Sequence, residues 1–140
     1  MTPATRTLEG GCQCGHVRYR IAGEPEGLVV CHCTACQRQT GSAFAMSLIV
    51  RRDALTLLQG TLKSFTRVAD SGNRLEGHFC PACGVRIYHS SSAVPDKIRV
   101  RPGTLDERDW LVPGKQIWTR SRQPWLAGEL ESIPAFAGQA

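Results

Sequence analysis

Residues 80–84 read Cys80-Pro81-Ala82-Cys83-Gly84, and this short stretch sets the fold expected for the 140-residue chain. Two cysteines separated by two residues resemble a zinc knuckle, a turn that directs two sulfurs toward one metal ion. Gly84 suits the backbone conformation that such a turn demands. The pair Cys12-Gln13-Cys14 is likewise followed by a glycine, Gly15. The pattern therefore predicts that each pair offers two sulfurs to one metal ion, Cys80 and Cys83 from a turn, and Cys12 and Cys14 because residues i and i+2 of a strand face the same side.

The chain has seven cysteines in three clusters: Cys12 and Cys14; Cys31, Cys33 and Cys36; Cys80 and Cys83. An odd number leaves one cysteine unpaired in any scheme made only of disulfides. A reducing cytosol also keeps thiols free, so cysteine-rich cytosolic chains more often bind metal. Disulfides, redox switching and cysteines scattered through a core are the alternatives. The cysteine pattern favours metal binding over all three.

The simplest partition gives two zinc sites of different kinds. The first joins Cys12, Cys14, Cys80 and Cys83 as a closed four-thiolate site. The second has only Cys31, Cys33 and Cys36, and three protein ligands with one open position are typical of a catalytic zinc. The alternative is that a histidine completes the second site and makes it structural. The candidates for that ligand are His16, His32 and His78, and strand alternation directs His32 away from its neighbours.

Composition indicates an ordinary globular domain. Hydrophobic residues make up 41% and charged residues 21%, and no apolar run approaches the roughly 18 residues of a membrane span. The first ten residues lack the apolar core of a signal peptide. We therefore expect a cytoplasmic protein without a membrane partner.

The formal net charge of +5 is weak evidence for a nucleic-acid partner. Two zinc ions held by seven thiolates would lower it to about +2. The basic residues are also dispersed, whereas a nucleic-acid binder usually has a basic stripe. Nucleic acid is therefore an unlikely partner, and the sequence leaves the oligomeric state open.

Fourteen glycines and eight prolines indicate many turns and short strands in a mainly β domain. Alternation and turn residues predict strands over 17–21, 28–33, 44–50, 55–58, 62–65, 74–80, 85–89, 98–100 and 116–118. A short helix is expected over 34–40, ended by Gly41. The spacing of Thr104 and Glu107 is that of a capping box and predicts a second short helix. Residues 1–9 are expected to be a flexible terminus and 127–140 an irregular tail.

Several motifs together resemble one known family. They are Gly11-Cys-x-Cys-Gly15, Cys31-His-Cys-x-x-Cys36-Gln, Gly41-Ser-Ala-Phe44, Phe79-Cys-x-x-Cys-Gly84, Gly103-Thr-Leu-Asp106 and Ile117-Trp-Thr-Arg-Ser-Arg-Gln-Pro-Trp125. In this order they are similar to the glutathione-dependent formaldehyde-activating enzyme family, whose domain also occurs in centromere protein V. The resemblance covers about residues 10–126, and these are the expected bounds of the zinc domain.

The resemblance implies an Mss4-like fold of small antiparallel sheets pinned by the structural zinc, and it implies the same partition of the seven cysteines. It also implies a carbon–sulfur lyase that acts on S-hydroxymethylglutathione or a related small thiol–aldehyde adduct. Cys31, Cys33 and Cys36 would then hold the catalytic zinc. A zinc-stabilised binding module without chemistry is the alternative, because a fold does not fix a function.

Residues near the three-cysteine cluster and in the tail motif are candidates for substrate binding: Ser42, Phe44, Trp118 and Trp125. The tryptophans fit a core or interface role equally well. Three arginines, Arg38, Arg120 and Arg122, could attract a substrate carboxylate, although a solvated surface is the simpler interpretation.

Overall fold

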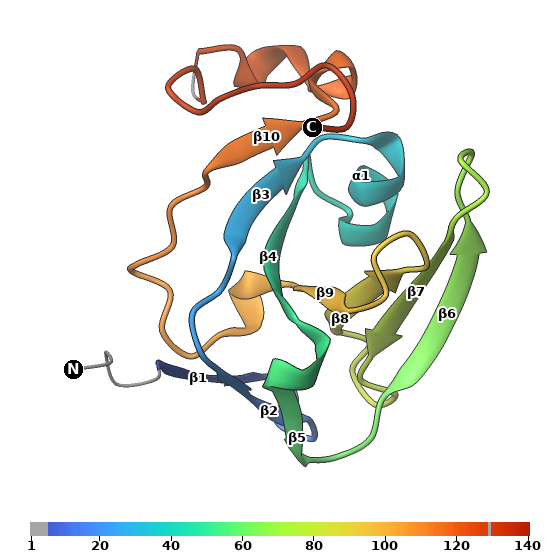
Figure 1. Ribbon diagram of the computed structural model, residues 1–140, viewed down its shortest axis with the longest axis vertical. Coiled ribbons are helices and arrows are strands. Elements are labelled where there is room, and N and C mark those ends of the chain that lie inside the picture. The colour runs from blue at the N-terminus through green and yellow to red at the C-terminus, as the bar shows by residue number, and fades with distance from the viewer. Residues whose placement is uncertain (1–5, 129) are drawn as a thin grey trace.

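The computed structural model describes residues 6–128 and 130–140, which form two β-sheets, one α-helix and four short 3-10 helices (Figure 1). The predicted mainly β fold, with antiparallel sheets and a short helix, is confirmed. Within the described residues, no helix has both the length and the hydrophobicity needed to cross a membrane.

The smaller sheet has three antiparallel strands in the order β1-β2-β5. Their bounds are β1 Thr7–Gly11, β2 Arg18–Ala22 and β5 Leu55–Gln59. In β2 the alternation holds, because Tyr19 and Ile21 are buried while Arg18 and Arg20 point outward. The prediction of a flexible terminus over 1–9 is wrong for its last three residues, since β1 begins at Thr7. Residues 1–5 lie outside the described part of the chain.

The larger sheet has seven strands in the order β10-β3-β4-β9-β8-β7-β6. Their bounds are β3 Gly27–Cys31, β4 Ala45–Arg51, β6 Lys63–Val68, β7 Arg74–Phe79, β8 Arg86–Ser91, β9 Lys97–Val100 and β10 Lys115–Ile117. All neighbours are antiparallel except β10 and β3, which run parallel. The strands expected at 55–58 and 62–65 exist, and they belong to different sheets.

Helix α1 (Thr34–Thr40) follows β3 directly and matches the prediction. Gly41 ends it in the left-handed conformation, with φ of 65° and its N–H bonded to the Gln37 carbonyl. The four 3-10 helices are η1 (Arg52–Ala54), η2 (Pro102–Thr104), η3 (Thr119–Ser121) and η4 (Pro124–Leu126).

The helix predicted from the capping box at Thr104 is wrong. The short helix η2 ends at Thr104, and residues 105–114 contain no helix. The Thr104 hydroxyl instead donates to the Arg101 carbonyl at 2.7 Å and lies 2.7 Å from the Tyr19 hydroxyl. Leu105 then bridges to Gly10 of β1. A side chain held between two sheets in this way is not free to cap a helix.

The main core lies between the two sheets. The small sheet contributes Leu8, Tyr19 and Ile21, and the large sheet contributes Leu28, Leu48, Val50, Ile87, Ile98 and Val100. These side chains are at most 8% exposed. Their burial is the main force that holds the sheets face to face. The opposite face of the large sheet is left for α1 and the site described below.

The tail, 127–140, has no regular strand among its described residues but is held against β10 (Figure 1). The N–H of Gln116 donates to the Pro134 carbonyl at 2.8 Å, and the N–H of Phe136 donates to the Gln116 carbonyl at 2.9 Å. The tail therefore continues the hydrogen bonding of the large sheet beyond β10.

A substitution at Gly10 can test how closely the two sheets approach each other. A Cβ atom there would overlap the Thr104 carbonyl oxygen and the Tyr19 ring. We expect Gly10→Ala to lower the free energy of unfolding by about 1–3 kcal/mol, as overpacking does. The control is Gly27→Ala, because a Cβ at Gly27 meets no atom within 4 Å. Urea denaturation measures the free energy of unfolding of both variants, and equal values would contradict the packing described.

Candidate functional site

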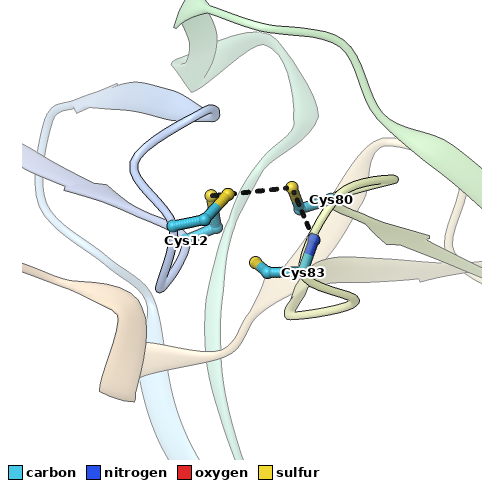
Figure 2. A group of neighbouring side chains, drawn as sticks. Cys12, Cys80 and Cys83 are labelled. Atoms are coloured by element: carbon cyan, nitrogen blue, oxygen red, sulfur yellow. Dashed lines mark hydrogen bonds between the residues drawn. The ribbon is translucent and has the colours of Figure 1, made fainter.

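Two matching turns bring four cysteine sulfurs together. Figure 2 shows Cys12, on the loop after β1, facing Cys80 and Cys83 on the loop between β7 and β8. The sulfurs of Cys12, Cys14, Cys80 and Cys83 all lie within 4.8 Å of one another. The Cys12–Cys14 and Cys14–Cys80 sulfur distances are 3.6 and 3.8 Å. Metal–sulfur bonds of about 2.3 Å in a tetrahedron require sulfurs about 3.8 Å apart, so the group fits one ion.

The backbone of each turn supports its sulfurs in the same way. Gly15 and Gly84 have φ of 83° and 81°, and their N–H groups bond to the carbonyls of Cys12 and Cys80. A side chain would be strained at either glycine. The N–H of Val17 donates to the Cys12 sulfur at 3.2 Å. The N–H of Ala82 donates to the Cys80 sulfur at 3.4 Å. These two bonds to sulfur stabilise its negative form, which is the form that binds metal.

Backbone N–H groups also act on Cys83. They lower the pKa of its thiol to about 6, the N–H of Val85 contributing most. This sulfur is therefore largely thiolate near neutral pH even without a metal ion.

The second group consists of Cys31, Cys33 and Cys36, whose sulfurs also lie within 4.8 Å of one another. Cys31 ends β3, Cys33 is the N-cap of α1, and Cys36 lies in the first turn of that helix. The Cys33 sulfur accepts the N–H of Cys36 at 3.2 Å, in the role that a serine usually has at this position. Strand end and helix start thus hold three sulfurs together.

Hydrogen bonds within this group shift the pKa values of its thiols in opposite directions. Bonds from the thiols of Cys31 and Cys36, and from backbone N–H groups, hold the pKa of Cys33 far below its usual range. The same bond to Cys33 raises the pKa of Cys31. The cluster therefore carries negative charge at neutral pH, which suits a cation.

No histidine joins either group among the described residues. His32 is fully buried, and its Nε2 lies 2.9 Å from the Gln116 amide oxygen. His78 pairs with Glu76 at 2.9 Å, stacks on Tyr88 and does not reach Cys80. The predicted partition of the cysteines into groups of four and three is therefore found in the structure, and each group could hold a metal ion.

A cavity of about 460 Å³ lies beside the three-cysteine group. Its wall is the face of α1 that includes Ala35, Cys36 and Gln39, and its floor comes from β6, β7 and β8. Cys36 is the cysteine that lines this space. A molecule in the cavity would therefore have direct access to the three-sulfur group.

Four arginines line the same cavity: Arg38, Arg67, Arg86 and Arg101. Sequence reasoning considered only Arg38, and then as a surface residue. Arg101 donates to the Met46 carbonyl at 3.0 Å and to the Gln39 amide oxygen at 3.0 Å. Burial lowers the pKa of its guanidinium, while the charge of Cys36 and its neighbours acts in the opposite direction. No local motif distinguishes these arginines, so no sequence pattern points to them.

The predicted substrate-binding residues lie outside this cavity. Ser42 is exposed beyond the end of α1, and Phe44 packs edge-on against His32 at 5.9 Å between ring centroids. Trp118 packs against the three-cysteine cluster with a left-handed backbone, φ 58°. Trp125 is 64% exposed, and its indole N–H donates to the Gln123 amide oxygen at 2.7 Å.

The two tail arginines do not line the cavity either. The Arg120 guanidinium donates to the Ala137 carbonyl at 2.9 Å and lies 5.2 Å from the Trp118 ring. It holds the tail in place. Arg122 is half-buried and does not line the cavity.

Comparison with known proteins supports this description. A sequence model of the family described as "Glutathione-dependent formaldehyde-activating enzyme" matches residues 7–121, which include all seven cysteines. A curated Halomonas elongata protein, whose name assigns it to the same enzymes, is 26% identical over 138 residues, covering 94% of this chain and 87% of the relative. A crystal structure of a Rhodobacter sphaeroides protein matches with a TM-score of 0.59 at 20% identity, covering 91% of this chain and 98% of that one. This last likeness supports the fold.

Replacing one cysteine in each group should give different results. Cys33→Ser keeps an oxygen at the N-cap of α1, so we expect the fold to remain while one metal ion per chain is lost. Cys80→Ser breaks the link between the two sheets, so we expect unfolding or aggregation. Elemental analysis and circular dichroism after growth with added zinc measure both effects. Identical behaviour of the two variants would show that the groups do not differ in role.

Proposed function

Because the chain belongs to the glutathione-dependent formaldehyde-activating enzyme family, we propose that it is a zinc-dependent carbon–sulfur lyase. Its substrate is S-hydroxymethylglutathione or a related small thiol–aldehyde adduct. The observation that carries the proposal is the three-sulfur group at the edge of a cavity large enough for a small thiol.

Zinc is the ion we assign to both groups. Thiolates are soft ligands, and tetrahedral sites made only of cysteine are typical of zinc. The four-sulfur group supplies a complete set of ligands and is assigned a structural role. The free thiols of all seven cysteines agree with a reducing compartment, and we assign the protein to the cytoplasm.

The three-sulfur group is assigned the chemical role. A zinc ion held there would have one open position, and it would favour the thiolate form of a substrate sulfur. Cys31 and Cys33 hold the group against β3 and α1, and Cys36 faces the cavity. We assign these three cysteines as the catalytic set.

The reaction is reversible addition of a thiol to an aldehyde. The substrate thiolate attacks the aldehyde carbon, a carbon–sulfur bond forms, and the former carbonyl oxygen takes up a proton. In the reverse direction the hydroxyl proton leaves, the carbon–oxygen double bond forms again, and the carbon–sulfur bond breaks. The chain contributes by orienting the sulfur and by excluding water from the cavity.

Zinc content and thiol response test the metal assignment. We expect two zinc ions per chain in protein purified without chelator, and we expect excess glutathione to perturb one of them. Cobalt substitution makes the perturbation visible, because a new sulfur ligand changes the charge-transfer absorption. Two ions that are indifferent to any thiol would instead support a binding module without chemistry.

Exchange between free glutathione, formaldehyde and their adduct tests the activity. The uncatalysed reaction also occurs, so the measured quantity is the acceleration above it, obtained by NMR exchange spectroscopy. We expect Cys33→Ser to abolish the acceleration, because the three-sulfur group is then incomplete. The matched control is Ser64→Ala, an exposed serine of β6 that does not line the cavity, which should keep the full acceleration.

A further inference from the structure

We propose that the cavity beside Cys36 is an anion-recognition subsite that selects small thiols carrying carboxylate groups and rejects thiols whose nearby charge is an ammonium. This inference rests on the proposed function and adds the substrate class. It is carried by the four arginines that line the cavity and by the absence of a carboxylate partner for any of them among the described residues.

The guanidinium groups of the cavity face no carboxylate; the negative charges that act on Arg101 and Arg86 are those of the three-cysteine group, Cys36 above all. Some arginines elsewhere in the chain do pair with carboxylates, as Arg18 does with Asp106 and Arg20 with Glu9 at 2.9 Å. In the described part of the chain, none of the four cavity arginines forms an ion pair. The cavity lining itself contains no aspartate or glutamate.

Gly77 shows that one of these arginines is held in a definite place. A Cβ atom at Gly77 would overlap the guanidinium of Arg86, so this group lies directly against the backbone of β7. Burial lowers the pKa of Arg86, and the positive charges of Arg101 and Arg67 lower it further. A partly desolvated cation among other cations is unfavourable unless an anion joins it. A bound carboxylate supplies that anion.

His89 adds a neutral polar group to the floor of the cavity. Its Nδ1 is buried and, among the described residues, has no hydrogen-bond partner. Burial and the surrounding arginines lower the pKa of His89 to about 3, so the ring is neutral at physiological pH. An unpartnered ring nitrogen at this place fits a ligand that exchanges a hydrogen bond with it.

The same lining disfavours an ammonium group. The amide oxygen of Gln39 already accepts a hydrogen bond from Arg101, and no carboxylate is present to receive a cation. For glutathione, the sulfur lies between a glycine end, which carries a carboxylate alone, and a γ-glutamyl end, which carries both a carboxylate and an ammonium. The cavity therefore takes the glycine carboxylate, because the γ-glutamyl carboxylate would bring its ammonium among the arginines.

Binding of four simple thiols to the zinc-loaded protein tests this subsite. Mercaptosuccinate has two carboxylates, 3-mercaptopropionate has one, 2-mercaptoethanol has none, and cysteamine carries an ammonium. We expect affinity to fall in that order, by about three- to tenfold for each carboxylate lost, since carboxylate–guanidinium bonds are charge-assisted. Isothermal titration calorimetry gives the affinities, and added salt should narrow the differences.

Arginine variants connect the preference to the cavity. Arg38 and Arg67 are exposed, so Arg38→Gln and Arg67→Gln should leave the fold intact. Each should weaken the binding of mercaptosuccinate about three- to tenfold, the range of one charge-assisted bond, and leave the affinity for 2-mercaptoethanol unchanged. The matched control is Arg74→Gln, on β7 but outside the cavity, which should change neither.

The outcomes separate this inference from the proposed function. Equal affinity for all four thiols, unchanged in the variants, would overturn the subsite and leave thiol binding at the three-sulfur group intact. A preference for cysteamine would also overturn it. If no thiol binds but thiol-free succinate binds and depends on Arg67, the subsite is supported and the lyase proposal fails. If neither thiols nor succinate bind, both are wrong.

Discussion

The fold depends on the meeting of two cysteine-bearing turns that are distant in sequence. Cys14 and Cys80 are 66 positions apart, yet their sulfurs lie 3.8 Å from each other where the hairpin of the small sheet reaches the β7–β8 loop of the large one. The apolar side chains of the small sheet are buried in the core that it shares with the large sheet. The sulfur contact and the core shared by both sheets attach the small sheet to the larger sheet. Because β7 and β8 also form the cavity floor, the same contact fixes that floor within the fold.

The features that could be predicted from the sequence are those that depend on a few adjacent residues. Each cysteine pair with its glycine is a local turn, and helix α1 is defined by its end at Gly41. The partition into four and three cysteines could be predicted because two pairs together supply the four ligands of one closed site, and the remaining three cysteines are close in sequence. The capping box at Thr104 was equally local but wrong, because the Tyr19 hydroxyl, from a distant strand, holds the threonine side chain.

The cavity could not be predicted, because it depends on strand register. Arg67, Arg86 and Arg101 come from or follow three different strands, and only the pairing of β6 to β9 places them around one space. Their sequence neighbours give no sign of this. Ser42 is near the cysteines in sequence but is not among the residues that line the cavity, and its role in substrate binding stays a prediction.

Hydrogen bonds of Gln116 connect the three-cysteine group to the C-terminal tail. Its amide oxygen faces His32, which lies between Cys31 and Cys33, and its amide N–H groups bond to the carbonyls of Leu130 and Ile133. On the ribosome, these three sulfurs are the first complete set to emerge, but Gln116, which supports them, follows His32 by 84 positions. The four-sulfur group is complete before that support is made. Synthesis order therefore allows a nascent chain to complete the four-sulfur group before the three-cysteine group gains its full support.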